Sequence, residues 1–423
     1  MTRPNIVVVG GSYVGAKVVD FLAPIVHESH DIILIEKNSH FQHLFAFPRI
    51  GVVPSFEHKA FIPFGPAFFK AVDKYASSDA SSRSPSSAIR IHNGTVKSVE
   101  PTRVILEKGD PIPYEFLVMA TGMGRPETMD KETGIHIARS SQQDISRAKK
   151  VLVVGGGAFG VQVATDIKTY VPTKDKHITL VHSRDRLLNR FGPALHDVVM
   201  KRCKELEIDV ILGNRIVIPP TGFLENEGEF EVKLTSGGSV KADLVILTTG
   251  SVVPLSSPLQ TLSPESIDPV TKYIKVKPTL QIDCLAPYDN VFAIGDVADT
   301  GAHKAARPGG VQAEIVARNI GMLIRAKKQT GGEANGNGSV DGRQLAEDGV
   351  AGSRDALEVY TPDVPSIHMS LGLDKGVIFQ NSGPRGEGGP IIRHEDTPQD
   401  IATLMSYSRW WTMRAEGIDD YYS

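Results

Sequence analysis

The stretch Lys150–Gly160, KVLVVGGGAFG, decides the fold of this 423-residue chain. A run typical of a buried strand leads into the pattern G-x-G-x-x-G, made by Gly155, Gly157 and Gly160, and an apolar helix pattern follows through Tyr170. The first glycine permits a tight turn, the second lets backbone amides approach a pyrophosphate, and the third lets the helix pack closely on the strand. The stretch therefore predicts a strand–turn–helix unit that binds the phosphates of a dinucleotide.

A second copy of this pattern lies near the start of the chain, at Asn5–Gly15. Its turn, GGSYVG from Gly10, has Ser12 where the second glycine is expected. The small hydroxyl side chain could still let the backbone approach and donate to a phosphate; the alternative is a degenerate loop that binds nothing. Glu36 favours binding, because it ends the next predicted strand, where a carboxylate accepts hydrogen bonds from ribose hydroxyls.

Two further pairs of segments show that the chain repeats itself. FLVMATG at 116–122 is echoed by DLVILTTG at 243–250, so the two halves lie roughly 130–145 residues apart. A later strand pattern, 290–296, ends in Gly-Asp and brings Asp296 to the first turn. The sequence predicts an α/β fold with two Rossmann-type (three-layer ββα) dinucleotide-binding domains, the second inserted into the first, and a small α+β C-terminal domain.

The expected boundaries follow from this duplication. The first dinucleotide-binding domain takes residues 1–125 and 253–326, and the second takes 126–252. A segment rich in Gly, Asn, Asp and Glu, 327–356, predicts a flexible loop. Residues 357–423 form the C-terminal domain, which contains a hairpin signal around Asp374-Lys375-Gly376.

The end of the second strand in the inserted domain carries no acid. Ser183 and Arg184 stand there, and either could contact a 2′-phosphate, which favours NADPH. Two alternatives remain open: Arg184 is merely solvated, or the neighbouring Asp185 turns in to accept NADH. We therefore expect NADH, NADPH or both as the donor.

Bulk properties exclude several other classes of protein. The formal net charge of −3 gives no basic surface for nucleic acid. The two cysteines, Cys203 and Cys284, are far apart and form no CxxC, so a dithiol relay is not expected. Apolar runs are of strand length, the start shows no signal peptide, and Thr2 stands where N-myristoylation needs glycine. We expect a cytoplasmic protein without a transmembrane helix.

The order of these motifs resembles the FAD-dependent pyridine-nucleotide oxidoreductase superfamily across nearly the whole chain. Within it, the chain is most similar to the ferroptosis-suppressor, apoptosis-inducing-factor-like, mitochondria-associated branch, which is related to type II NADH:quinone oxidoreductases. The stretches that carry this likeness are HFQHLFAFPR (His40–Arg49), ITLVHSRDRL (Ile178–Leu187), AIGDVADTGAHKAA (Ala293–Ala306), SLGLDKGVIFQNSG (from Ser370) and RWWTMR (from Arg409).

The resemblance implies a flavoprotein that holds FAD in the first domain and NADH or NADPH in the second, with no metal. Hydride would pass to the flavin and two electrons to a quinone or another small acceptor. It also implies a role near the flavin for Lys304, with a surface lysine as the alternative. For Arg49 it implies an FAD contact, with a salt bridge at a domain interface as the alternative.

One departure from the family concerns its usual Gly-Val-Glu, which here is Gly160-Val161-Gln162. Gln162 can bond the nicotinamide carboxamide but cannot act as a base, and Asp166 matches a second family acid one helical turn later. The candidate catalytic residues are thus Lys304, Gln162 and Asp166. The candidate cofactor-binding residues are Gly10, Ser12, Gly15, Glu36, Lys37, Arg49, Val96, Ala120, Thr121, Gly122, Asp296, Gly155, Gly157, Gly160, Ser183, Arg184 and Gly250.

The C-terminal aromatic segment, with Tyr407, Trp410, Trp411 and Met413, has two interpretations. It could make a peripheral membrane contact or line a quinone entrance. Alternatively, it packs the C-terminal domain onto the body or onto the second subunit of a homodimer. Two other functions also remain open, an apoptosis-inducing-factor-like redox-signalling role and a monodehydroascorbate- or ferredoxin-reductase-like activity.

Overall fold

The computed structural model describes residues 3–76, 83–124, 130–223, 228–249, 253–286, 288–333, 356–383, 387–396, 413–415 and 418. Contacts group the chain into two compact units. The first unit comprises Met1–Asn38, Phe69–Thr128 and Val252–Asp363. The second unit comprises Ser39–Phe68, Met129–Ser251 and Val364–Ser423.

The first unit is built on a parallel five-stranded sheet in the order β19-β9-β1-β2-β5. In this sheet β1 lies between β2, where Ile6 pairs with Ile32, and β9, where Ile6 pairs with Phe116. Parallel sheets are covered on both faces, which explains the nearly continuous apolar runs of β1 and β9. The strands are β1 (Asn5–Val9), β2 (Asp31–Glu36), β5 (Ile89–Asn93), β9 (Phe116–Met119) and β19 (Val291–Ala293).

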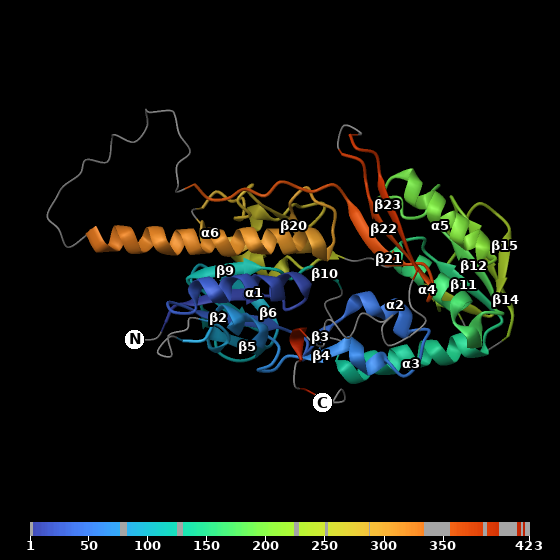
Figure 1. Cartoon of the computed structure of the whole chain (residues 1–423), viewed down its shortest axis with the longest axis horizontal. Helices are drawn as coiled ribbons and strands as arrows, with labels where there is room; N and C mark the ends of the chain where they lie inside the picture. The colour runs from blue at the N-terminus through green and yellow to red at the C-terminus, as the bar shows by residue number, and fades with distance from the viewer. Residues whose placement is uncertain are drawn as a thin grey trace. The chain divides into compact units, whose positions relative to one another are not determined.

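Two helices of the first unit pack along each other, α1 (Tyr13–Val26) and α6 (Ala306–Glu333), as Figure 1 shows. Their approach is close, because a Cβ added at Gly321 would lie 2.8 Å from Ile25 Cγ2. α6 continues past Ala326, so residues 327–333 of the segment expected to be a flexible loop are helical. An ion pair of 2.8 Å between Lys327 and Glu115 ties this extension to the unit.

Shorter elements complete the first unit. They are β6 (Val96–Glu100), β7 (Arg103–Leu106) and β8 (Ile112–Pro113) in an antiparallel meander; β10 (Met123–Gly124) with β17 (Val253–Pro254); β18 (Ile274–Lys275) with β20 (Ala298–Asp299); and the 3-10 helices η3 (Lys70–Tyr75), η4 (Ser86–Ala88), η6 (Ser257–Thr261), η7 (Pro264–Ser266) and η8 (Gly295–Val297).

The second unit repeats the plan on a parallel four-stranded sheet in the order β13-β12-β11-β16. Its strands are β11 (Lys150–Val154), β12 (His177–Val181), β13 (Ile208–Ile211) and β16 (Leu244–Leu247). Its helices are α2 (Phe47–Ile50), α3 (Lys131–Arg147), α4 (Ala158–Thr169) and α5 (Pro193–Glu205), with the 3-10 helices η1 (Leu44–Ala46), η2 (Glu57–Ala60) and η5 (Val171–Thr173).

The remaining strands of the second unit are antiparallel. They are β3 (His40–Gln42) with β4 (Phe61–Pro63), β14 (Phe230–Lys233) with β15 (Ser239–Ala242), and the sheet β21 (Ser366–Ser370), β22 (Lys375–Gln380) and β23 (Ile391–Asp396). The hairpin predicted in the tail is β21–β22. Its turn lies at 371–374, so Lys375 already belongs to β22.

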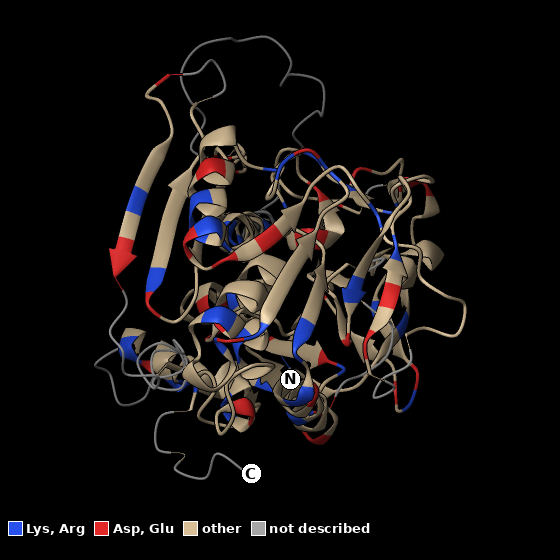
Figure 2. Ribbon diagram, turned by 90° about the vertical axis from the view of Figure 1, so that its right-hand side faces the viewer, with Lys and Arg blue, Asp and Glu red and all other residues tan. Residues whose placement is uncertain are grey.

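The α/β class is confirmed, with two parallel sheets that each carry a strand–glycine turn–helix unit. The division into units differs from the expected domains, since 39–68 and the tail from Val364 group with the sheet of 150–247. Within the described residues, no helix combines the length and apolar character needed to cross a bilayer. Figure 2 shows both signs of charge mixed along the same strands and helices.

Candidate functional site

The glycine turn of the first unit leaves no space for side chains at its two ends. Gly10 has φ +100°, and a Cβ there would lie 2.5 Å from the carbonyl oxygen of Ala120. A Cβ at Gly15 would lie 1.7 Å from the carbonyl oxygen of Gly10. Ser12 is the N-cap of α1 and its side chain is exposed. The turn thus brings the first amides of α1 to the end of the sheet, where an anion binds favourably.

Glu36 joins the second strand to this turn. Its Oε2 accepts a 2.5 Å hydrogen bond from the N–H of Gly11. Its Oε1 accepts from the backbone N–H (2.9 Å) and the side-chain amide (3.0 Å) of Asn38. A carboxylate has about four acceptor positions, so Glu36 can still accept from a ribose hydroxyl. The next residue, Lys37, is half-buried.

The Gly-Asp motif reaches the same turn. Asp296 lies in η8, and the preceding Gly295 has φ +71° and donates its N–H to Gln312 Oε1 at 2.8 Å. A Cβ at Gly309 would lie 2.4 Å from Cγ2 of Val14, so α6 presses against the first turn of α1. Gln312 is a residue that sequence reasoning missed, because an amide in a predicted helix does not show which backbone group it will contact.

Four other candidates for FAD binding lie directly after β9 (Ala120, Thr121 and Gly122) or in the apolar core (Val96). Ala120 is buried, Thr121 Oγ1 donates to the Leu255 carbonyl at 2.7 Å, and the Gly122 carbonyl accepts from the Leu255 N–H at 3.0 Å. Val96 is 7% exposed and belongs to the apolar core beside the sheet. A direct FAD contact at these positions remains a prediction.

The glycine turn of the second unit has the same construction. Gly155 has φ +120°, and a Cβ there would lie 2.5 Å from Thr248 Oγ1. A Cβ at Gly160 would lie 1.9 Å from the Gly155 carbonyl oxygen. A Cβ at Gly157, the N-cap of α4, would meet no described atom within 4 Å. Gly155 and Gly160 are therefore needed by the fold, whereas Gly157 leaves space for a ligand. The candidate Gly250 lies outside the described residues.

A histidine that the sequence reasoning did not single out holds this second turn. The N–H of Gly156 donates to Nδ1 of His182 at 3.0 Å. A Cβ at Gly156 would lie 2.3 Å from Leu187 Cδ2 and 2.7 Å from His182 Cγ. The pattern GGG, with a histidine directly after β12, was the only sequence signal for this contact.

Of the two residues expected to select the donor nucleotide, Ser183 lines a pocket and Arg184 does not. Ser183 lines a pocket of about 140 Å³ at the carboxyl ends of β11 and β12. Arg184 is exposed and is not among the residues that line this pocket. Arg215, which follows β13, does line it.

Asp166 and Arg49 form a buried ion pair in the second unit. Arg49 donates to both carboxylate oxygens of Asp166 at 3.1 Å, and Nη2 also donates to the Gly372 carbonyl at 3.0 Å. Burial raises the pKa of the Asp166 carboxyl, and the Arg49 guanidinium opposes that rise. Arg49 thus forms a salt bridge, as in the alternative, but within the second unit and not at a domain interface; an FAD contact for Arg49 remains a prediction. Asp166, a candidate catalytic residue, is thus completely buried and paired, and a catalytic role for it remains a prediction.

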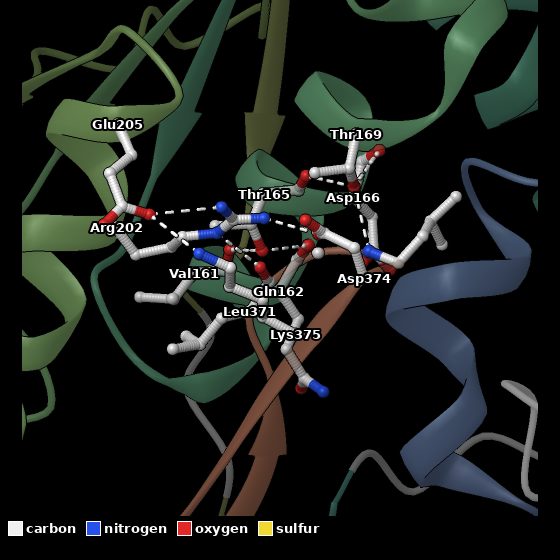
Figure 3. A network of polar contacts seen from close by, with 12 residues as sticks. Val161, Gln162, Thr165, Asp166, Thr169, Arg202, Glu205, Leu371, Asp374 and Lys375 are labelled. Atoms are coloured by element: carbon white, nitrogen blue, oxygen red, sulfur yellow. Dashed lines mark hydrogen bonds and ion pairs between the residues drawn. The ribbon is translucent and has the colours of Figure 1, made fainter. Parts of the chain in front are cut away.

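Gln162 belongs to a network that ties the β21–β22 turn to α4 and α5 (Figure 3). Its amide donates to Ser370 Oγ at 3.0 Å. Arg202 donates to the Leu371 carbonyl at 3.0 Å and pairs with Asp374. This arrangement fixes the Gln162 amide, so that its nitrogen faces β21.

Lys304 is half-buried in the first unit. Its Nζ donates to the carbonyl of Ala298 and lies 4.3 Å from the centroid of the Tyr273 ring, in a cation–π contact. These contacts distinguish it from a solvated surface lysine. Tyr407, Trp410 and Trp411 of the aromatic tail lie outside the described residues, and Met413 is half-buried.

Comparisons with known proteins agree with the two turns. The family model described as pyridine nucleotide-disulphide oxidoreductase matches residues 4–321. Fe-regulated protein 8 of Mycosarcoma maydis is 30% identical over 444 residues, which cover 99% of this chain and 97% of the relative. Ferroptosis suppressor protein 1 of Taeniopygia guttata is 27% identical, with 75% of this chain and 80% of that protein covered.

Solved structures share the fold. The sulfide:quinone oxidoreductase from Aquifex aeolicus superposes with a TM-score of 0.66 and 18% identity, covering 98% of this chain and 92% of that one. A water-forming NADH oxidase from Lactobacillus brevis, bound to NADH, gives a TM-score of 0.59 with 15% identity over 90% of this chain and 75% of that one.

Proposed function

The chain belongs to the pyridine nucleotide-disulphide oxidoreductase family, and we propose from this premise that it passes electrons from NAD(P)H to a quinone-type acceptor. It is an FAD-dependent NAD(P)H oxidoreductase in its general chemistry. Bound FAD supplies the two-electron redox chemistry that links donor and acceptor.

The observation that carries the donor and flavin part of the proposal is the pair of glycine turns, one on each parallel sheet. In each turn, neither the first nor the last glycine has space for a side chain. These glycines are Gly10 and Gly15 in the first turn and Gly155 and Gly160 in the second. Two such turns provide two pyrophosphate sites in one chain. The first has a carboxylate at the ribose position, Glu36, and is the one we assign to FAD. The second we assign to the nicotinamide donor.

The cysteines support an acceptor that takes electrons without a thiol relay. The sequence contains only two cysteines. Cys203 is buried in α5, and burial raises the pKa of its thiol to about 12, so it does not form a thiolate near neutral pH. Cys284 is half-buried and its Sγ lies 3.0 Å from the carbonyl of Ala286. A quinone, the acceptor in the name of the sulfide:quinone oxidoreductase that shares this fold, meets this requirement.

Lys304 is the residue we propose for acceptor chemistry. A cation held in place stabilises negative charge that develops on an oxygen of the acceptor. The Tyr273 ring and the Ala298 carbonyl fix the Lys304 ammonium before any ligand arrives. Such prior positioning makes an electrostatic contribution effective, because no reorganisation is needed during the reaction.

Gln162 has a proposed binding role on the donor side. Its nitrogen donates to Ser370, which leaves the amide oxygen as an acceptor for the carboxamide of the nicotinamide. An amide does not carry a proton away, so we assign Gln162 to orientation and not to acid–base chemistry.

The test is steady-state oxidation of NADH and NADPH with a panel of quinones, ferricyanide and oxygen. We expect the fastest turnover with a quinone. Lys304→Met should lower kcat with quinones by about tenfold or more and affect ferricyanide less, since ferricyanide carries no developing oxyanion. Lys277→Met is the matched control, because Lys277 is, like Lys304, a half-buried lysine of the same unit, and it is paired with Asp289 at 3.3 Å. Absence of quinone turnover, with dimerisation on reduction, would instead support the redox-signalling function.

A further inference from the structure

The pocket beside Ser183 is too small for a whole dinucleotide. Its volume of about 140 Å³ compares with roughly 300–1,000 Å³ for a typical small-molecule site. It lies at the carboxyl ends of β11 and β12, where ligands bind in open parallel sheets. It therefore fits one end of the donor, the adenosine end, because the pyrophosphate belongs at the adjacent turn that begins with Gly155.

The lining has the chemistry of an adenosine site with a negative substituent. Ile216 and Ile218 form an apolar wall, and Ile218 remains 50% exposed at the rim. Ser183 and Arg215 are polar residues of the same lining. No Asp or Glu occurs among the lining residues that the structure describes. An acid at this place selects a free 2′-hydroxyl, whereas an arginine accommodates a 2′-phosphate.

Backbone hydrogen bonds fix the position of Arg215. The N–H of Asn214 donates to the His182 carbonyl at 3.0 Å, which extends the pairing of β12 and β13 past the end of both strands. Oδ1 of Asn214 then accepts from the N–H of Arg215 at 3.0 Å. The Arg215 carbonyl accepts from the N–H of Thr235 at 2.8 Å. Arg215 is thus held on both sides by its backbone, although its side chain is exposed.

The charge of Arg215 is not neutralised within the described chain, where no carboxylate lies within ion-pair distance of its guanidinium. Arg184 is exposed too, but its contact with this region is its carbonyl, which accepts from the N–H of Gly213 at 2.8 Å. The pocket therefore has one guanidinium in its lining, and it is that of Arg215.

We propose that Arg215 is the specificity-determining residue for the electron donor: its guanidinium binds the 2′-phosphate of NADPH, with Ser183 as a second donor, and makes NADPH the preferred nucleotide. The proposal rests on the proposed function only in taking a nicotinamide dinucleotide as the donor. The sequence analysis expected Arg184 to contact the 2′-phosphate, and we now assign this contact to Arg215. The bond is charge-assisted, the type that phosphate recognition by arginine uses.

The experiment measures binding of two fragments to the full-length holoenzyme by isothermal titration calorimetry. The probes are adenosine 2′,5′-bisphosphate and 5′-AMP, which differ only in the 2′-phosphate. We expect the bisphosphate to bind at least about tenfold more tightly to the unaltered chain. Arg215→Ala should remove most of that difference and change 5′-AMP binding by less than about twofold. Arg215→Lys should retain part of it, and Arg184→Ala, the matched control, should retain it fully.

Three results would overturn the proposal: equal binding of the two probes to the unaltered chain, an unchanged difference in Arg215→Ala, or loss of the difference in Arg184→Ala. Thermal unfolding of each variant separates a folding defect from a binding defect. Neither fragment contains nicotinamide or reaches the acceptor, so failure here leaves the quinone proposal standing, and failure of quinone turnover leaves this one standing.

Discussion

Nδ1 of His182 accepts a 3.0 Å hydrogen bond from the N–H of Gly156, so an imidazole at the end of β12 holds the glycine turn that follows β11. Burial lowers the pKa of His182; Arg184 lowers it further, whereas the backbone of Arg186 and the charge of Asp185 oppose the change. Only the neutral ring has a lone pair at Nδ1 to accept this bond. At neutral pH the turn is therefore held in place.

Donor binding should weaken as the pH falls through the lowered pKa of His182, because protonation removes the acceptor for Gly156. Loss of one such bond corresponds to about 1 kcal/mol, or about fivefold in Kd. His182→Phe should bind NADPH about fivefold more weakly at neutral pH and lose this part of the pH dependence. Calorimetric titration with NADPH between about pH 8 and about pH 5 measures both effects.

The control for that experiment is His177→Phe. His177 begins β12, at the end of that strand opposite to the turn, and its Nε2 lies 3.2 Å from Asp209. Its replacement should leave unchanged the pH dependence of NADPH binding that protonation of His182 causes. If His182→Phe keeps the pH dependence of the unaltered chain, the imidazole does not control the turn.

Two glycines of the second turn should separate folding from binding. Gly160→Ala places a Cβ 1.9 Å from the Gly155 carbonyl, and we expect a loss of stability of about 3 kcal/mol or more. Gly157→Ala meets no described atom within 4 Å and has φ −80°, so the chain should fold normally yet bind NADPH at least about tenfold more weakly. Urea unfolding and NADPH titration give the two quantities. Normal NADPH binding by Gly157→Ala would show that no pyrophosphate lies at this turn.

The ion pair of Arg49 and Asp166 should act on stability. Asp166→Asn leaves the Arg49 cation buried without its partner, which costs about 3–5 kcal/mol of unfolding free energy. The double variant Arg49→Met with Asp166→Leu should cost less than the sum of the single changes, because it removes both charges. Denaturant unfolding tests this. An Asp166→Asn variant with normal stability but lower kcat would restore Asp166 as an acid of the reaction.

His43 should make stability depend on pH. Burial lowers its pKa to about 4, whereas an unfolded histidine titrates near 6.5. Between these pH values the unfolded chain binds more protons, so the free energy of unfolding falls as the pH drops from about 6.5 to about 4. Over this pH range the free energy of unfolding falls by about 3 kcal/mol. Urea unfolding of His43→Gln should show a shallower decline over this range, and an unchanged slope would exclude His43 as its source.

The sequence was sufficient for features that depend on neighbouring residues. The glycine turns could be predicted because Gly10 and Gly155 take positive φ values that other residues avoid, and Glu36 could be predicted because it ends a strand at a known place. A dinucleotide at each turn follows from these patterns, and the resemblance to the family adds that one of the two is FAD.

Contacts between distant segments could not be predicted. Arg49 and Asp166 are 117 positions apart and meet only through the packing of α2 on α4. Arg215 reaches the pocket because β13 lies beside β12, which the local pattern around Arg184 does not reveal. Gln312 and His182 bond backbone N–H groups in other elements, and their local sequence does not identify which N–H group each will contact.

The central claim is tested most directly by the visible absorption spectrum of the purified protein under nitrogen. We predict a flavin spectrum that bleaches on addition of one equivalent of NADPH and returns on addition of one equivalent of a short-chain quinone, without oxygen. A protein that shows no flavin spectrum, or whose bleached spectrum does not return with any quinone, would contradict the account.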